Sequence, residues 1–380
     1  MKKILILHNR YLKYGGEDSV LENESKLLKK KYIVDQLIFE NKDINSASFI
    51  WKGIYNTDSS QLLENKILSF KPDVIHLHNF FYQMSPAVFI IAKKHQVPLM
   101  ITIHNYRLLC PSALLTKASS PCQLCITQAI PLSGIKHACF KNSRLKTAHL
   151  SLILGLHHLN QTFIKGISKF IFLTPFAKRI FQSSHMNIAD DQSIVKPNFI
   201  EDFGYSEYSK RKNYFLFIGR LSKEKGIPTL LKSLESSNQK VEIIGDGPLK
   251  EKVIEASKKY PHLKFHGFQN KDFVSEKLKK CKALIFPSEW YEGLPMTILE
   301  AFSTGTPVIC GNIDNVKDIV SDGINGLHFQ WGNSDDLSQT LNQAELNEEY
   351  YLNARKTYLS KYTPEANLQQ FESIINELTC

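Results

Sequence analysis

Two glutamates in the C-terminal part of the chain have a spacing that suits an anionic ligand rich in hydroxyl groups. Glu292 and Glu300 lie eight residues apart, on either side of the expected start of a helix. Proline is favoured at the first helical position, so we expect the free N–H groups of the first turn to point at a bound phosphate. Glu292 would face the ligand from the loop, and Glu300 would accept hydrogen bonds from vicinal hydroxyls. The other contacts would come from Leu294, Pro295, Met296 and Thr297.

Two cations stand in a second segment that could bind the same anion. Arg220 and Lys225 lie five residues apart, across a turn that follows a strand-like run, and Gly219 and Gly226 flank them. Breaking a bond to a diphosphate leaves negative charge on the leaving group, which such cations stabilise. An isolated Arg and Lys are more often solvated surface residues, but the flanking glycines favour a ligand loop.

Glycines and a histidine add weaker signals. Gly15 and Gly16 follow the first strand and open a helix, so their bare backbone can approach a phosphate or an acceptor closely. Gly245 and Gly247 form a tight turn at the end of another strand. His104 ends a strand at its carboxyl end, where ligands of parallel sheets bind. A glycine pair alone is more often a turn, and a lone histidine is more often structural.

Short apolar runs that alternate with helix-length segments must position these residues. Such alternation is typical of parallel α/β sheets. The first series of expected strands is Ile4–His8, Asp35–Phe39, Asp73–His78, Leu99–His104, Phe170–Thr174 and Ile194–Lys196. The second series is Tyr214–Ile218, Val241–Ile244, Leu263–Phe265, Ala283–Phe286, Val308–Cys310 and Gly326–Phe329. Two series predict two sheets, and His76 and His78, at the end of one strand, are interpreted as scaffold.

The order of these motifs resembles the retaining nucleotide-sugar glycosyltransferases of family 4 (glycosyl transferases group 1). The resemblance rests on Glu292–Glu300, Phe217–Gly226, Ile243–Pro248 and Tyr14–Glu17, which occur in the family's order and cover both halves of the chain. It implies the GT-B fold, in which two Rossmann-like, doubly wound domains face each other across a cleft.

The resemblance also implies roles for the candidate residues. Positions that match Arg220 and Lys225 bind the donor phosphates, the one that matches Glu300 binds the ribose hydroxyls, and the ones that match Glu292 and His104 contact the transferred sugar. The retaining mechanism is thought to be a front-face displacement in which the leaving phosphate helps to deprotonate the acceptor. The donor would be a UDP or GDP sugar, the acceptor would be a saccharide carried on a lipid, and catalysis would need no cofactor.

Length and composition agree with two domains. The chain has 380 residues, 43% of them hydrophobic, with 23 phenylalanines, which is enough for two cores. We expect an N-terminal, acceptor-binding domain over residues 1–200 with a cysteine-containing insertion over about 106–145. A nucleotide-sugar domain over 201–361 would follow, and a helix over 362–380 would cross back to the first domain.

The net charge of +10 favours anionic partners. The N-terminal apolar run is too short for a signal peptide, and no stretch is long enough to span a membrane, so a cytoplasmic protein is expected. A basic cluster precedes the apolar run Leu150–Leu156: Lys136, His137, Lys141, Arg144 and Lys146. This segment either forms an amphipathic helix that packs on the core or makes a peripheral contact with the anionic inner face of the cell membrane.

Four cysteines occur in the expected insertion. Cys110, Cys122, Cys125 and Cys139 form a C-x11-C-x2-C-x13-C pattern. In a reducing compartment such a group indicates a structural zinc site more readily than disulfides. Loosely packed or redox-active thiols are the alternative, and His137 could replace one ligand.

Other classes fit less well. A nucleic-acid-binding protein would use the positive charge, but no aromatic-interleaved basic stripe or known module is visible. A sugar-nucleotide epimerase of the GT-B type and a non-catalytic sugar-nucleotide-binding relative remain as alternatives. The nucleotide base, the sugar, the acceptor, the linkage and the oligomeric state depend on features that the sequence does not reveal.

Overall fold

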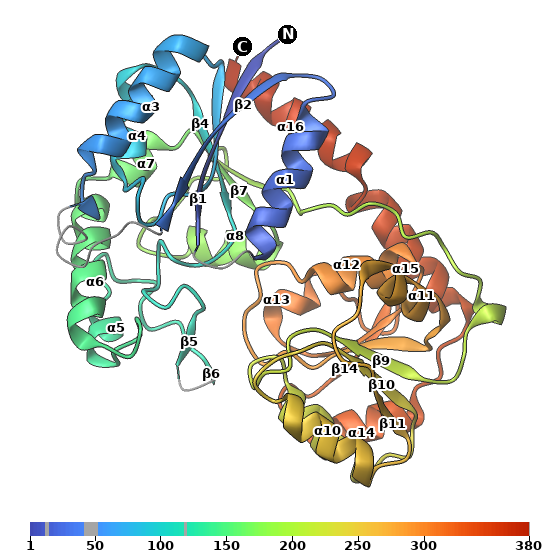
Figure 1. Ribbon diagram of the computed structural model, residues 1–380. Helices are drawn as coiled ribbons and strands as arrows, with labels where there is room; N and C mark the ends of the chain where they lie inside the picture. The colour runs from blue at the N-terminus through green and yellow to red at the C-terminus, as the bar shows by residue number, and fades with distance from the viewer. Residues whose placement is uncertain (12–14, 42–51, 118–119, 380) are drawn as a thin grey trace. The chain divides into compact units, whose positions relative to one another are not determined.

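The computed structural model describes residues 1–11, 15–41, 52–117 and 120–379 (Figure 1). The chain divides into two compact units. The first contains Met1–Lys117, Cys122–Lys196 and Leu368–Cys380, and the second consists mainly of Pro197–Asn367. Each unit is an α/β structure around one six-stranded sheet, and every strand pair in these two sheets is parallel.

The sheet of the first unit has the order β2-β1-β3-β4-β7-β8. Its strands are β1 (Lys3–Arg10), β2 (Ile33–Glu40), β3 (Val74–Asn79), β4 (Leu99–Ile103), β7 (Lys169–Phe172) and β8 (Ser193–Val195). The central strands β3, β4 and β7 are buried at every position, as continuous apolar runs covered on both faces must be. All six strands of the first expected series are confirmed, with ends that differ by one or two residues.

Helices cover both faces of this sheet (Figure 1). The described helices of this unit are α1 (Gly16–Leu28), α3 (Thr57–Phe70), α4 (Ala87–Lys94), α5 (Leu132–Lys136), α6 (Arg144–Leu159), α7 (Thr162–Gly166), α8 (Pro175–Gln182) and the end of α16 (Pro364–Thr379). Phe371, Ile374 and Ile375 of α16 join the core that α1 forms against the sheet, which ties the last helix to this unit. A two-stranded ribbon, β5 (Thr116–Lys117) with β6 (Ser120–Pro121), was not expected from the sequence.

The sheet of the second unit has the order β11-β10-β9-β12-β13-β14. Its strands are β9 (Phe215–Ile218), β10 (Val241–Ile244), β11 (Leu263–Phe265), β12 (Ala283–Phe286), β13 (Val308–Gly311) and β14 (Gly326–Phe329), which confirms the second expected series. The helical elements are η2 (Tyr208–Lys210), α9 (Ile227–Ser233), α10 (Lys250–Lys259), α11 (Lys271–Lys280), α12 (Met296–Ser303), α13 (Asp314–Lys317), α14 (Ser334–Gln343) and α15 (Glu348–Lys361). Figure 1 shows α10 and α14 on one side of this sheet and α11, α12 and α15 on the other.

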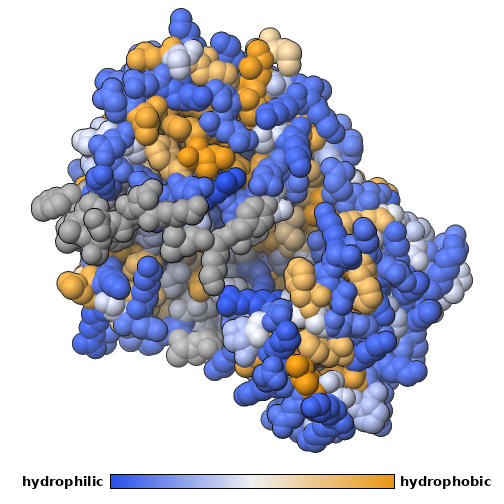
Figure 2. Space-filling view, in the orientation of Figure 1, coloured by the Kyte–Doolittle hydropathy of each residue, from blue (hydrophilic) through white to orange (hydrophobic). Residues whose placement is uncertain are grey.

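The surface is mostly polar. On the face drawn in Figure 2, hydrophilic residues predominate and hydrophobic ones are scattered in small groups. No helix of the described residues is both long and apolar enough to cross a membrane.

Candidate functional site

The motifs of the second unit lie where the order of the strands reverses. From β9 the chain moves outward through β10 and β11, then returns to the other side of β9 with β12. Loops at the carboxyl ends of two such strands diverge and leave a crevice, where α/β proteins bind ligands. The loops after β9, β10 and β12 carry the predicted cations, the glycine turn and the two glutamates.

The glycine turn after β10 packs directly on the loop after β9. The N–H of Gly219 donates to the Ile244 carbonyl at 3.1 Å, and the N–H of Leu221 donates to the Asp246 carbonyl at 2.9 Å. Gly245 has φ +151°, and a Cβ there would stand 1.9 Å from the Gly219 carbonyl oxygen. Gly245 is therefore required by backbone packing, because any side chain would push the two loops apart.

Lys225 and Glu292 meet at this carboxyl end of the sheet. The Lys225 ammonium forms an ion pair with Glu292 Oε1, and the Ser288 hydroxyl donates to the same oxygen at 2.8 Å. The ammonium also lies 5.6 Å from the ring centre of Trp290. The pair stays partly accessible, with side chains 23% and 12% exposed, so an incoming anion can reach the lysine.

Arg220 is in a different situation from Lys225. Its side chain is exposed, and within the described ranges no carboxylate pairs with it. A cation without a carboxylate partner at the end of β9 is available to an anionic ligand.

The two predicted glutamates flank the start of α12, as expected. Pro295 is the N-cap residue, with φ −73° and ψ +110°, and the first helical residue is Met296, so the prediction of Pro295 at the first helical position was one residue early. An extended ψ is what a residue just outside a helix adopts. Leu294 and Pro295 are buried, whereas Met296 and Thr297 are partly exposed.

Glu300 lies one turn into α12. Burial raises its pKa to about 7, although Lys271 opposes the shift. In the part of the chain that the structure covers, no donor reaches the Glu300 carboxylate. A half-buried carboxylate with free acceptor sites can accept hydrogen bonds from a ligand's hydroxyl groups.

In the first unit, Gly15 and Gly16 open α1 as predicted. Gly15 is the N-cap residue, and its N–H donates to the Asp18 carboxylate at 2.9 Å. Among the residues that the structure describes, a Cβ on either glycine would meet no atom within 4 Å, so none of them requires the small size of these glycines. Tyr14, which was part of the same motif, lies outside the described residues.

Glu17, the second residue of α1, connects this loop to the strand end at His104. Its carboxylate accepts a hydrogen bond from Asn105 Nδ2 at 3.0 Å. Burial raises the pKa of Glu17 to about 7, against the lowering effects of Asn105 and Arg107.

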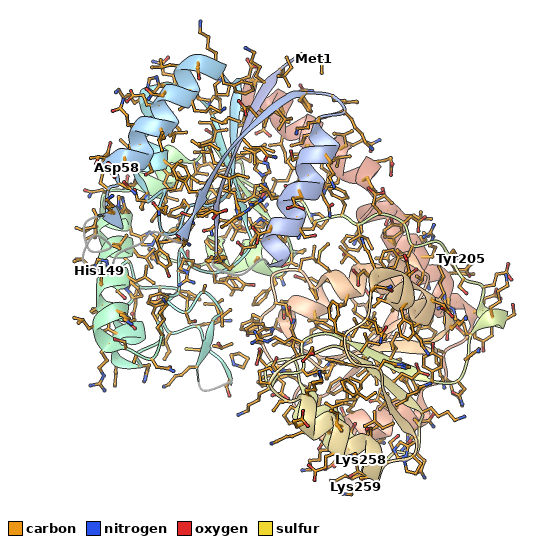
Figure 3. All side chains as sticks on the ribbon, viewed as in Figure 1. Met1, Asp58, His149, Tyr205, Lys258 and Lys259 are labelled. Carbon is orange, nitrogen blue, oxygen red and sulfur yellow. The ribbon has the colours of Figure 1, made fainter. Side chains whose placement is uncertain are left out.

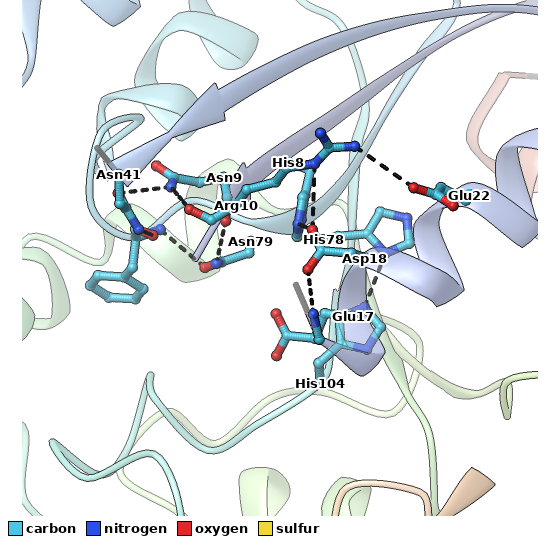
Figure 4. A network of polar contacts seen from close by, with 12 residues as sticks. His8, Asn9, Arg10, Glu17, Asp18, Glu22, Asn41, His78, Asn79 and His104 are labelled. Atoms are coloured by element: carbon cyan, nitrogen blue, oxygen red, sulfur yellow. Dashed lines mark hydrogen bonds and ion pairs between the residues drawn. The ribbon is translucent and has the colours of Figure 1, made fainter. Parts of the chain in front are cut away.

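His104 belongs to a buried polar network at the carboxyl ends of β1, β3 and β4 (Figure 4). His78 Nδ1 and His104 Nε2 are 3.0 Å apart, and the two rings are stacked with centres 5.2 Å apart. His78 Nε2 lies 3.2 Å from the Glu24 carboxylate, which the Lys196 ammonium approaches at 2.8 Å. The prediction that His76 and His78 are scaffold therefore leaves out the contact of His78 with His104.

Burial holds the pKa values of His78 and His104 well below 6.5, so both rings are neutral. Of the two facing nitrogens, His78 Nδ1 and His104 Nε2, one donates a proton and the other accepts it. His104 Nδ1 takes no part in this contact.

The sequence analysis did not single out Glu24 and Lys196. Both side chains are completely buried, and they are 172 residues apart in the sequence. The one available signal was that His8, His78 and His104 all stand at strand ends, which indicates a polar layer needing a counter-charge.

Glu24, His76 and His78 place their ligand atoms within 4.8 Å of one another, a spacing that could suit a metal ion. Glu24 is already neutralised by Lys196, and His76 Nε2 is 2.8 Å from the Thr102 hydroxyl. A cation would have to compete with a buried ammonium for the only carboxylate, so these residues do not fit a metal ion.

The four cysteines of the predicted metal site line one pocket. Cys110 and Cys125 are buried, Cys122 and Cys139 are partly exposed, and all four are free thiols. Burial raises the pKa of Cys125 to about 12, with a further contribution from Cys110.

Comparisons with known proteins show similarity to glycosyltransferases. Residues 199–360 match the family model for glycosyl transferases group 1. An uncharacterised glycosyltransferase of Methanocaldococcus jannaschii is 30% identical over 139 residues, which are 36% of this chain and 39% of that protein. A lipopolysaccharide 1,6-galactosyltransferase of Salmonella typhimurium is 33% identical over 147 residues, 36% of this chain and 41% of that one.

The matches thus span about two fifths of the length of these curated relatives. The crystal structure of Anabaena HepE in complex with UDP is similar over 99% of this chain and 100% of that one, with a TM-score of 0.68 and 17% identity. The chain therefore has the α/β fold of GT-B glycosyltransferases, with two Rossmann-like domains. The match to the family model falls within the second unit.

Proposed function

We propose that this chain is a retaining glycosyltransferase that transfers a sugar from a nucleotide diphosphate to a saccharide acceptor in the assembly of a cell-surface polysaccharide. The observation that carries the proposal is the cluster at the carboxyl ends of β9 and β12. There, Lys225 and Glu292 are paired but accessible, and Arg220 has no carboxylate partner. The similarity to a lipopolysaccharide galactosyltransferase supports the class of product.

The donor would bind mainly to the second unit. Its diphosphate would draw Lys225 from Glu292 and engage Arg220, while N–H groups at the start of α12 face the same charge. Glu300 would accept hydrogen bonds from the two ribose hydroxyls. Once released from Lys225, Glu292 could accept hydrogen bonds from the sugar that is transferred.

In the reaction the bond between the anomeric carbon and the diphosphate oxygen breaks, and a bond from the acceptor hydroxyl oxygen to that carbon forms on the same face. The acceptor proton passes to the leaving diphosphate. The two cations stabilise the charge that develops on the leaving group, and this electrostatic effect is commonly the largest one in such sites. No protein nucleophile is assigned.

The first unit would contribute to sugar and acceptor recognition. His104 Nε2 contacts His78 Nδ1, and His104 Nδ1 is the ring nitrogen that would meet the sugar. The bare backbone at Gly15 and Gly16 has room for a close approach. UDP and GDP remain the candidate nucleotides.

A lipid-linked acceptor would be met at a membrane surface, and α6 offers a suitable face. Leu145, Leu152, Leu156 and Leu159 recur at helical spacing and are 82%, 51%, 36% and 66% exposed. Arg144 and Lys146 flank the stripe at its start. Figure 3 labels His149 on the same helix. An exposed leucine stripe with basic neighbours suits an anionic lipid surface.

Binding and transfer are tested together. The purified chain is first screened by thermal shift against UDP, GDP, ADP and their sugar conjugates. A sugar conjugate that binds is then incubated with the protein and saccharide acceptors. Nucleotide release and the anomeric configuration of the product are measured. We expect a selective rise in melting temperature and acceptor-dependent release with retention. An epimerase would interconvert the donor without an acceptor, and a non-catalytic relative would bind without turnover; either result contradicts transfer.

The membrane contact is tested by sedimentation with phosphatidylglycerol and phosphatidylcholine vesicles. Leu152→Glu should abolish binding to the anionic vesicles. Leu352→Glu, on α15 of the second unit, changes a leucine with the same 51% exposure and should have no effect. Equal binding by both variants would contradict a role for α6.

A further inference from the structure

Four cysteines from separate turns converge on one small pocket. Cys110, Cys122, Cys125 and Cys139 line it together with Ser133 and His137, among others. The sequence separates the first cysteine from the last by 29 positions, so the clustering is a result of tertiary structure. No other described pocket or cluster of the chain brings together so many thiols.

Backbone hydrogen bonds hold each cysteine in its own turn. The N–H of Cys110 donates to the Tyr106 carbonyl at 2.8 Å, and that of Cys122 donates to the Leu115 carbonyl at 2.7 Å beside the β5–β6 ribbon. Cys125 accepts from the Gln128 N–H at 3.0 Å. Cys139, just after α5, donates to the Gly134 carbonyl at 3.1 Å. The turns present four thiols to the same space.

Little regular structure holds this region in place. From Tyr106 to Ser143 the described elements are α5, of five residues, and the two-residue strands β5 and β6. Ala113, Leu115 and Ala138 have positive φ angles of 67°, 49° and 51°, an unfavourable backbone region for residues with a side chain. Such a segment needs additional stabilisation from a packed core or a cross-link.

The chemistry of four cysteines favours a metal cross-link. All four are free thiols in the structure, and soft sulfur ligands in a set of four select zinc in a tetrahedral site. His137 Nε2 is 3.1 Å from the Lys117 ammonium, and the four cysteines of the pocket make a complete tetrahedral set without this histidine. We propose that Cys110, Cys122, Cys125 and Cys139 bind one structural zinc ion that fixes the turns of residues 106–143.

Zinc binding would tighten the cluster. Within the described chain, only Glu24, His76 and His78 have three ligand atoms that all lie within 4.8 Å of one another, so no three of the four sulfurs are this close together. Zn–S bonds of about 2.3 Å in a tetrahedron place the sulfurs about 3.8 Å apart. Each thiol loses its proton to solvent, and one Zn²⁺ with four thiolates has a net charge of −2.

Basic residues around the pocket match that charge. Lys117 lines it and places its ammonium 3.1 Å from Nε2 of His137, another lining residue, and Lys136 precedes His137 in the sequence. Without a metal these cations stand beside neutral thiols. A zinc tetrathiolate gives this part of the basic cluster an electrostatic partner.

The test measures metal content in the full chain, purified without chelators from zinc-supplemented medium. We expect one zinc per chain by elemental analysis, and after growth with cobalt the visible spectrum of tetrahedral Co²⁺ with thiolate ligands. Cys125→Ser should reduce the zinc content to near zero. Cys281→Ser is the matched control, because this thiol lies 3.5 Å from the Leu278 carbonyl in the other unit and should leave one zinc bound.

The wild-type chain alone can overturn the proposal, even if the variants fold poorly. The proposal is refuted if the zinc content stays near zero after incubation with excess zinc. Mass spectrometry would then find the four cysteines as reactive thiols or in disulfide-linked peptides. One zinc per chain that Cys125→Ser retains would place the metal elsewhere and refute it equally. Metal content does not depend on donor binding, so failure of the proposed transfer reaction would leave this test unchanged.

Discussion

Each unit pairs a lysine with a glutamate, but the two pairs have opposite environments. In the first unit, Lys196 and Glu24 are 2.8 Å apart and both side chains are 0% exposed. In the second, the side chains of Lys225 and Glu292 are 23% and 12% exposed. Lys196 lies 3.9 Å from the ring centre of Phe371, inside the core that α16 completes. The same two residue types thus form a buried pair in the core of one unit and an accessible pair at the surface of the other.

The difference shows how burial limits what an ion pair can do. A buried pair is strongly coupled because neither charge can return to water, so it holds its neighbours in one arrangement. Here those neighbours include His78 and, through it, His104. A partly exposed pair is weakly coupled, and an anionic ligand can displace the carboxylate from the lysine. We expect mutations of the first pair to act on stability and mutations of the second to act on activity.

The largest expected effect is on the buried pair. Lys196→Ala leaves the Glu24 carboxylate buried without its counter-charge and should cost about 3–5 kcal/mol of unfolding free energy. The measurement is urea denaturation of the full chain. Lys225→Ala is the matched control and should cost less than about 1 kcal/mol. The double variant Glu24→Leu, Lys196→Met should recover most of the lost stability. Equal stability of Lys196→Ala and wild type would contradict a structural role for the buried pair.

The second effect is on turnover. Lys225→Ala and Arg220→Ala should each reduce kcat by about 10²- to 10³-fold, because each removes a charge that stabilises the leaving diphosphate. Steady-state kinetics with the donor found in the screen measures this loss. Lys223→Ala changes an exposed lysine of the same loop and should leave kcat unchanged. A loss in Lys223→Ala as large as in the other two would point to damage of the loop and contradict specific roles.

Glycines offer a third test of the same contrast. Gly245→Ala forces a Cβ against the Gly219 carbonyl at 1.9 Å and should destabilise the second unit by about 2–3 kcal/mol. Gly16→Ala has open space around it and should change stability by less than about 1 kcal/mol. If a ligand approaches this backbone, Gly16→Ala should nevertheless lose activity. Normal stability together with normal activity would contradict a ligand role for the first glycine loop.

The smallest expected effect is a pH dependence from Glu300. Its pKa is raised to about 7, so ionisation favours donor binding only as the pH rises toward that value. Donor affinity should increase by up to about tenfold per pH unit below pH 7 and level off above it. Calorimetry with a nucleotide sugar between pH 5.5 and 8.5 tests this, since its diphosphate diester has no ionisation there. Glu300→Gln should bind more weakly and without this slope.

The same shift has a consequence for stability with the opposite sign. Because the folded state binds the Glu300 proton more tightly than the unfolded state, wild type should lose stability as the pH rises from about 4.5 to about 7, the ordinary and the raised pKa. Glu300→Gln should show less of this loss in urea denaturation over the same range. Identical pH profiles for variant and wild type would contradict the raised pKa.

Some features could be predicted from residues close together in the sequence. The twelve strands of the two sheets follow from local runs rich in apolar residues, because strands that are covered on both faces hold few polar side chains. The start of α1 at Gly16 and the loop that carries Glu292 were also predicted from local signals. The position of Pro295 was wrong by one residue because propensity alone does not fix the exact end of a helix.

The sequence by itself thus determined the α/β class, the two series of strands and the placement of most candidate residues at strand ends. Only the tertiary structure decided that Glu24 and Lys196 meet across 172 positions, that His78 contacts His104, and that four cysteines share a pocket. The physical reason is that local patterns report which residues avoid water. The partners of a buried charge or thiol depend on how distant segments pack.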